Sequence, residues 1–202
     1  MFFAKSSANL EIYLENYTKG SIALMKGKIV YLGLGTNMGD RFQNLLNCIL
    51  LITNSKNIKV MSLSSIYESP SWGFVSNDFY NMVIKIETKS KPLELLIQLK
   101  NIEAKMGRLK KTKDKNYEER IIDIDLLIIE NEIIETKDLK IPHPEIKNRA
   151  FVLNPLLEIN SNILLNENNL HETKNNINGK DELKLLVNES NKLLKALNEL
   201  KS

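Results

Sequence analysis

Two aspartates, Asp123 and Asp125, are separated by one residue in the apolar stretch RIIDIDLL, residues 120–127. Side chains two residues apart on a β-strand point to the same face, so the two carboxylates are expected to project together. Two like charges on a buried face repel, and each is costly to bury without a partner. A divalent cation removes this conflict, because Mg²⁺ binds carboxylates together with water and substrate phosphates. The alternative is that one or both aspartates face solvent.

Basic side chains precede this pair, at Arg108, Lys110, Lys111, Lys113, Lys115 and Arg120. Cations beside paired carboxylates are typical of sites where a metal ion meets a polyphosphate, because the substrate charge must be neutralised during transfer. A solvated lysine loop is the alternative, and it is favoured for the lysines at 111, 113 and 115. His143 lies between two prolines, where a structural role is more common than a catalytic one.

The segment GLGTNMG, residues 33–39, is rich in glycine but does not match a nucleotide-binding motif. It lacks the Gly-Lys-Ser/Thr ending of a P-loop and the spacing of a Rossmann turn. We interpret its glycines as turn geometry and close packing. The simplest interpretation places Phe79 and Phe151 in the core and Asn81 in a turn. These residues have a binding role if a flat heterocycle lies between the two rings and its edge forms hydrogen bonds with the amide.

The composition is that of a globular chain of one or two domains, with 202 residues, 43% hydrophobic and 26% charged. The single cysteine, Cys48, excludes an internal disulfide and a cysteine metal cluster. No apolar run approaches the roughly 18 residues of a membrane span, so we expect no membrane partner and a cytoplasmic location. A net charge of +3 gives no argument for a nucleic-acid partner.

Hydrophobic periodicity predicts strands over 29–34, 58–67, 79–87 and 121–130, and helices over 41–53 and 92–106. This β-α-β-β-α-β order predicts an α+β fold, a ferredoxin-like sandwich with an antiparallel sheet and two helices on one face. We expect a loop over 68–78 and a short helix over 147–158. A polar loop or disordered segment is expected over 160–180, followed by an amphipathic C-terminal helical extension over 181–200.

Several segments together resemble the 6-hydroxymethyl-7,8-dihydropterin pyrophosphokinase family of folate biosynthesis. They are YLGLGTNMGDR (31–41), SIYESP (65–70), FYN (79–81), EAKMGR (103–108), RIIDID (120–125) and PHPEIKNRAF (142–151). The order and spacing of these pieces, over about 28–159, carries the resemblance. It implies a ferredoxin-like fold and transfer of the pyrophosphoryl group of ATP to the pterin hydroxymethyl oxygen, with release of AMP.

The resemblance also implies roles for individual residues. Asp123 and Asp125 resemble the ligands of two Mg²⁺ ions, and they form the catalytic set together with Arg108 and Arg120. The residues expected around ATP, the co-substrate, are Glu103, Lys110, Tyr117, His143 and Arg149. Those expected around the pterin are Ser69, Pro70, Trp72, Phe79, Asn81 and Phe151.

The chain departs from the family pattern at three positions in the basic loop. Lys110 stands where the family usually has Arg, Tyr117 where it has Trp, and Glu118 where it has a small residue. Lysine keeps the charge of arginine but loses its planar fork. We expect these changes to affect the rate and the closed geometry of the loop more than the type of reaction.

We expect a pyrophosphokinase domain over 28–160, an N-terminal extension over 1–27, and a polar linker with a C-terminal helix over 161–202. The expected partners are ATP and the hydroxymethyl dihydropterin, with no nucleic acid. We expect a monomer, with a dimer through the C-terminal helix as the alternative. Two other functions stay open: an RNA-binding module on the ferredoxin-like sheet, and a non-catalytic relative or fragment of a fused folate enzyme.

Overall fold

The structure is a computed structural model, and it describes residues 27–71, 76–107, 119–165, 168–170, 177 and 179–200. Within these residues no helix is both long enough and apolar enough to cross a membrane. Residues 1–26 of the predicted N-terminal extension lie outside the described residues. So do four of the predicted site residues, Trp72, Arg108, Lys110 and Tyr117.

The main sheet is antiparallel, and its described part has six strands in the order β10-β3-β4-β1-β5, with β2 also paired to β4. The strands are β1 (Lys28–Thr36), β2 (Ile58–Leu63), β3 (Tyr67–Ser69), β4 (Phe79–Thr88), β5 (Asp123–Ile129) and β10 (Lys184–Leu185). β1 lies between β4 and β5 and pairs antiparallel with both. This order confirms the predicted ferredoxin-like sandwich.

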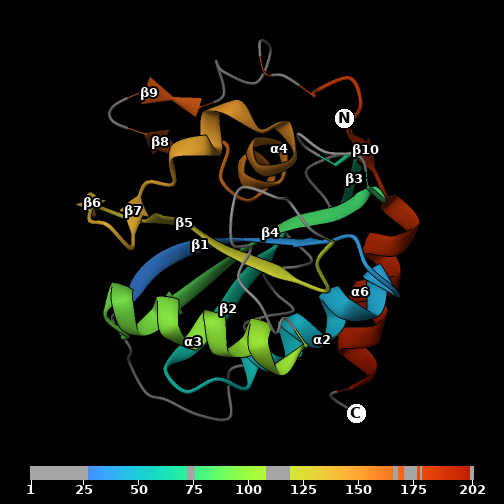
Figure 1. Cartoon of the computed structure of the whole chain (residues 1–202), viewed down its shortest axis with the longest axis horizontal. Coiled ribbons are helices and arrows are strands. Elements are labelled where there is room, and N and C mark those ends of the chain that lie inside the picture. The colour runs from blue at the N-terminus through green and yellow to red at the C-terminus, as the bar shows by residue number, and fades with distance from the viewer. Residues whose placement is uncertain are drawn as a thin grey trace.

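Two helices, α2 (Arg41–Thr53) and α3 (Pro92–Lys105), cover one face of the sheet, as predicted (Figure 1). The side chain of Asp40 caps α2 by accepting the backbone N–H of Gln43. Proline suits the first position of α3, and Gly107 ends that helix with a φ of +100° that favours glycine. The apolar sides of both helices pack on the strands and form the larger core.

The opposite face is covered by α4 (Ala150–Ile159), which follows the 3₁₀ turn η1 (Pro144–Asn148) (Figure 1). Apolar side chains of α4 form a second core with the strands. The single helix predicted over 147–158 is therefore divided. The division falls at Arg149, whose extended conformation (φ −122°, ψ 107°) interrupts the helical backbone.

The segment after α4 is not the simple polar loop that the sequence predicts. Two short strands, β8 (Leu164–Leu165) and β9 (Asn168–Asn169), pair with each other. The segment also adds buried apolar side chains to the second core: Ile163, Leu165, Leu170 and Ile177. Because these apolar residues are irregularly spaced among asparagines, they give no periodic signal. A second small pair, β6 (Ile134–Glu135) with β7 (Lys140–Ile141), follows β5.

The strand predicted over 58–67 is two strands, β2 and β3. Between them, the hydroxyl of Ser64 accepts the N–H of Val83, and the N–H of Ser64 donates to the Val83 carbonyl, both at 2.9 Å. These bonds keep the chain attached to β4 while its direction changes. Since β3 extends to Ser69, the first residues of the predicted loop belong to the sheet.

The C-terminal helix α6 (Val187–Glu199) begins later than predicted, because β10 precedes it and pairs with β3. Leu193 and Leu197 of α6 are buried in the larger core. The hydroxyl of Ser190 accepts the N–H of Ile66 at 2.9 Å, in the segment between β2 and β3. The helix therefore packs on the domain and supports the edge of the sheet.

We predict that L193A lowers the free energy of unfolding by about 2–4 kcal/mol, because Leu193 is only 2% exposed and its removal leaves a cavity. Urea denaturation followed by circular dichroism measures this change. L200A is the matched control, since Leu200 is 60% exposed, and it should change stability by less than about 0.5 kcal/mol. Equal effects of the two variants would contradict the packing of α6 on the domain.

Candidate active site

Asp123 and Asp125 lie on the same face of β5, as the sequence predicts. They are paired with Gly35 and Gly33 of β1 in the sheet register. Both aspartates line a smaller cavity on one side and a larger cavity on the other. The two carboxylates therefore form a wall that the cavities share.

The electrostatics of this wall suit a cation. Burial, followed by the negative charge of Asp123, raises the pKa of Asp125 to about 7, while Arg149 and Arg120 act in the opposite direction. Arg120 forms an ion pair with Asp123. In the described part of the chain, no cluster of three or more His, Cys, Asp or Glu side chains could hold a metal ion. The residues present fit Mg²⁺, which is commonly held by one or two carboxylates and completed by water and phosphate.

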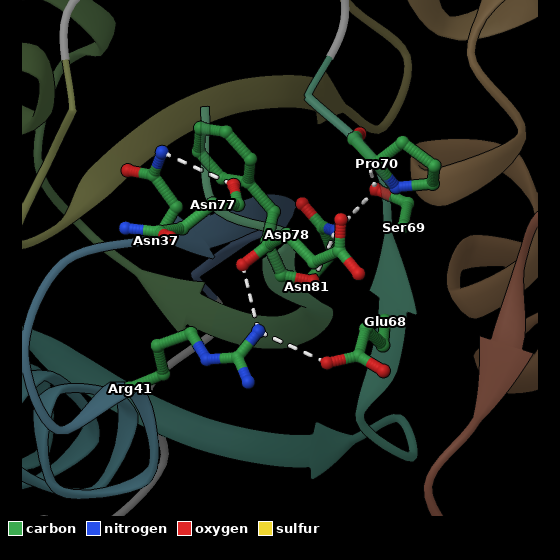
Figure 2. Close-up of polar contacts among 9 residues, drawn as sticks. Asn37, Arg41, Glu68, Ser69, Pro70, Asn77, Asp78 and Asn81 are labelled. Carbon is green, nitrogen blue, oxygen red and sulfur yellow. Dashed lines mark hydrogen bonds and ion pairs between the residues drawn. The ribbon is translucent and has the colours of Figure 1, made fainter. Parts of the chain in front are cut away.

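Asn37 holds the backbone of Arg120 in place. The Oδ1 atom of this buried residue accepts the N–H of Arg120 at 2.7 Å, and its own N–H donates to the Arg120 carbonyl at 3.1 Å. Its Nδ2 atom donates to the Ser76 hydroxyl at 2.9 Å. The same atom donates to the Asn77 carbonyl at 3.4 Å (Figure 2). Asn37 thus connects the segment before β4 with the segment before β5, a role that its position in a turn sequence does not reveal.

The smaller cavity brings together the predicted pterin residues that the structure describes: Ser69, Pro70, Phe79, Asn81 and Phe151. Asn81 is 5% exposed, and its Nδ2 atom donates to the Ser69 hydroxyl at 3.0 Å (Figure 2). A Cβ atom at Gly35 would contact Asn81 at 3.4 Å and Phe79 at 3.7 Å, so glycine leaves this part of the wall open. The cavity offers ring faces and an amide, which suit a flat heterocycle.

The larger cavity, of about 580 Å³, contains Glu103 and His143, two of the residues predicted to lie near ATP. It also has an apolar wall of Leu96, Ile124, Leu126 and Leu139. It is also lined by three lysines that the sequence analysis does not predict: Lys100, Lys137 and Lys140. Arg149, predicted to lie near ATP, lines the smaller cavity instead, together with Arg120.

Glu103 and His143 each have a defined partner. A carboxylate oxygen of Glu103 accepts the N–H of Ile124 at 2.8 Å, which fixes β5 between the two aspartates. The Nδ1 atom of His143 accepts the N–H of Glu145 at 3.2 Å. Burial, and next the charge of Arg149, lower the pKa of His143, so its ring is neutral at pH 7 with the proton on Nε2.

The position of α4 is fixed by Glu158 near its C-terminal end. The Glu158 carboxylate accepts the N–H and the hydroxyl of Ser65, at 3.1 and 2.7 Å, and the hydroxyl of Tyr67 at 3.0 Å. These bonds connect α4 to β3 and to the residues before it. Phe151 of α4 and Ser69 of β3 line the same smaller cavity.

Comparison with known proteins identifies the family. Residues 31–161 match the family described as 7,8-dihydro-6-hydroxymethylpterin-pyrophosphokinase (HPPK). The chain belongs to the HPPK family. It is 41% identical over 136 residues to the 2-amino-4-hydroxy-6-hydroxymethyldihydropteridine pyrophosphokinase of Aquifex aeolicus (strain VF5), over 67% of this chain and 82% of that protein. The Bacillus subtilis (strain 168) protein of the same name is 39% identical over 132 residues, 65% of this chain and 77% of the relative.

Other relatives in the HPPK family are longer. The chain is 40% identical over 177 residues to folic acid synthesis protein FOL1 of Dictyostelium discoideum, which is 86% of this chain but 26% of that protein. A crystal structure of Plasmodium falciparum HPPK-DHPS wild type with pterin and p-hydroxybenzoate aligns with a TM-score of 0.60. That alignment has 18% identity and covers 81% of this chain and 47% of the other, so it supports the fold alone. HPPK family members are ATP-dependent diphosphotransferases of folate biosynthesis, and the chain is an enzyme of this class.

Proposed function

We propose that the pyrophosphoryl group passes from ATP to 6-hydroxymethyl-7,8-dihydropterin at the wall shared by the two cavities. The observation that carries this proposal is that Asp123 and Asp125 line both cavities. A pterin in the smaller cavity and ATP in the larger one meet at the same pair of carboxylates. The hydroxymethyl oxygen then bonds to the β-phosphorus of ATP, the bond from that phosphorus to the oxygen of the leaving AMP breaks, and the hydroxyl proton passes to water. Family membership favours this enzyme over the RNA-binding module.

The smaller cavity supplies the chemistry that a pterin needs. Phe79 and Phe151 offer ring faces for stacking, which contributes about 0.5–1.5 kcal/mol beyond the burial of area. The Nδ2 atom of Asn81 donates to the Ser69 hydroxyl at 3.0 Å and to the Phe79 carbonyl at 3.5 Å, so the amide is held in place and its Oδ1 atom offers an acceptor. This acceptor can bond to a donor at the pterin edge. We therefore assign recognition of the pterin ring to these residues.

The larger cavity suits ATP. Its apolar side chains can pack on an adenine ring, and its lysines can attract phosphate oxygens. Neutral His143 is able to donate a hydrogen bond from Nε2, because its Nδ1 atom is already used as an acceptor. Glu103 holds the backbone of β5 in place and thereby the spacing of the carboxylates.

The catalytic contribution of the protein is positioning and charge neutralisation, which dominate phosphoryl-type transfer. Asp123 and Asp125 are the residues that would hold Mg²⁺. When bound, Mg²⁺ neutralises the polyphosphate and makes the pterin hydroxyl more acidic. Arg120, anchored by Asn37, and Arg149 beside the pair place positive charge where negative charge develops on the phosphates.

Several finer assignments stay predictions. They are the presence of two Mg²⁺ ions, the monomeric state and the cytoplasmic location. The roles of Arg108, Lys110 and Tyr117 at the phosphates, and of Trp72 beside the pterin, also stay predictions. The division of the chain into domains at residues 28 and 160 also stays a prediction. Helix α6 packs on the domain that precedes it in the chain.

We predict that D125N reduces AMP release from ATP and the pterin by at least about 100-fold, because a charged ligand of the metal is lost. The unfolding temperature should stay equal or rise, since the amide removes a buried repulsion from Asp123. A coupled AMP-release assay measures the rate. The exposed aspartate Asp181 provides the control variant D181N, expected to be fully active. Near-normal turnover of D125N at saturating Mg²⁺ would show that the metal assignment is wrong.

We predict that N81A weakens pterin binding by about 1–3 kcal/mol, which is roughly 5- to 150-fold in the dissociation constant. The affinity for a non-hydrolysable ATP analogue should stay within about twofold, because Asn81 lines only the smaller cavity among the two described. Isothermal titration calorimetry measures both constants. N162A, at an exposed asparagine beyond α4, is the control. Unchanged pterin affinity in N81A would remove Asn81 from the pterin site.

A further inference from the structure

Arg41, the first residue of α2, is absent from the linings of both cavities. Its side chain extends to the end of β3 and the start of β4, where these strands pair (Figure 2). Its Nη1 atom donates to a carboxylate oxygen of Glu68 at 3.0 Å and to the carbonyl of Asp78 at 2.7 Å. The guanidinium carbon lies 3.9 Å from the centre of the Tyr80 ring.

The partners of Arg41 are the immediate neighbours of the pterin residues. Glu68 precedes Ser69 on β3, and Asp78 precedes Phe79 at the start of β4. In the register of the two strands, Glu68 pairs with Tyr80 and Ser69 pairs with Phe79. One guanidinium therefore contacts both strands one residue away from the side chains that line the smaller cavity.

We propose that Arg41 is a positioning residue for the pterin site. By holding β3 and the start of β4 together, it fixes the spacing between Ser69, Phe79 and Asn81. This inference rests on the proposed assignment of the smaller cavity to the pterin. Arg41 acts through its neighbours and does not touch the substrate.

A guanidinium suits this task better than an ammonium. The guanidinium lies over the Tyr80 ring while its Nη1 atom donates to a carboxylate and a carbonyl, whereas lysine offers a point charge on a flexible stem. The side chains of Arg41 and Glu68 are 26% and 19% exposed, so their ion pair is partly shielded from water. The base of the Arg41 side chain is rigid, because α2 is capped by Asp40 and packs in the larger core.

The test measures the dissociation constants of the pterin for R41M, R41K and E68Q, in the presence of Mg²⁺ and a non-hydrolysable ATP analogue. We expect R41M to weaken pterin binding about tenfold, since small displacements of positioning groups have large effects. R41K should be intermediate. The affinity for the ATP analogue should stay within about twofold in all three variants. E68Q should weaken pterin binding in the same direction, and R41M/E68Q should be less than additive because both changes remove one contact.

Y31F is the matched control for a general loss of stability. Tyr31 lies nearer the start of β1 and its hydroxyl bonds to Glu130 and Asn160, outside the linings of both cavities. Y31F should lower the unfolding temperature without changing pterin affinity, which separates stability from positioning.

The outcomes distinguish this inference from the proposed function. Wild-type pterin affinity in folded R41M, or in folded E68Q if R41M does not fold, overturns the role of Arg41. Equal weakening of pterin and ATP analogue also overturns it, because that result indicates general damage. N81A serves as the reference: if N81A binds the pterin normally, the pterin site itself is misassigned.

Discussion

The site depends on the proximity of two carboxylates on one partly buried strand. The side chains of Asp123 and Asp125 share a face because β5 is extended, and they repel because little solvent separates them. Burial, and next the negative charge of Asp123, raise the pKa of Asp125 to about 7. Under the proposed function a bound cation would relieve this repulsion, and the arginines beside the pair would neutralise the polyphosphate.

The surrounding elements hold the walls of the two cavities around this pair. Glu103 of α3 bonds to the backbone between the aspartates, and Asn37 holds Arg120 just before β5. The carboxylate of Glu158 connects α4 to Ser65 and to Tyr67 of β3. Arg41 ties β3 to the start of β4. Each of these contacts joins segments far apart in the sequence, so the geometry of the site is a property of the whole domain.

Much of this fold is readable from local sequence signals. Alternation and apolar runs predict the strands, Asp40 marks the start of α2, and Gly107 marks the end of α3. The shared face of Asp123 and Asp125 follows from the strand period alone. The pterin and ATP residues came from the resemblance to a family, since phenylalanines and an asparagine have no distinctive spacing by themselves.

Features that depend on tertiary contacts are not predictable from local sequence signals. Lys100 lies on α3, whereas Lys137 and Lys140 lie around the β6–β7 pair, and only folding brings them to one cavity. Ile163 and Ile177 are irregularly spaced, yet both are buried against α4. Asn37 and Arg41 read as turn and helix residues because their partners lie between 27 and 83 positions away.

We propose that both substrates meet at the aspartate pair. A crystal structure of the protein with Mn²⁺ in place of Mg²⁺, a non-hydrolysable ATP analogue and 6-hydroxymethyl-7,8-dihydropterin would test this arrangement. We expect anomalous metal density on Asp123 and Asp125, the pterin between Phe79 and Phe151, and the analogue in the larger cavity. Metal density away from both aspartates, or a pterin bound in the larger cavity, would contradict it.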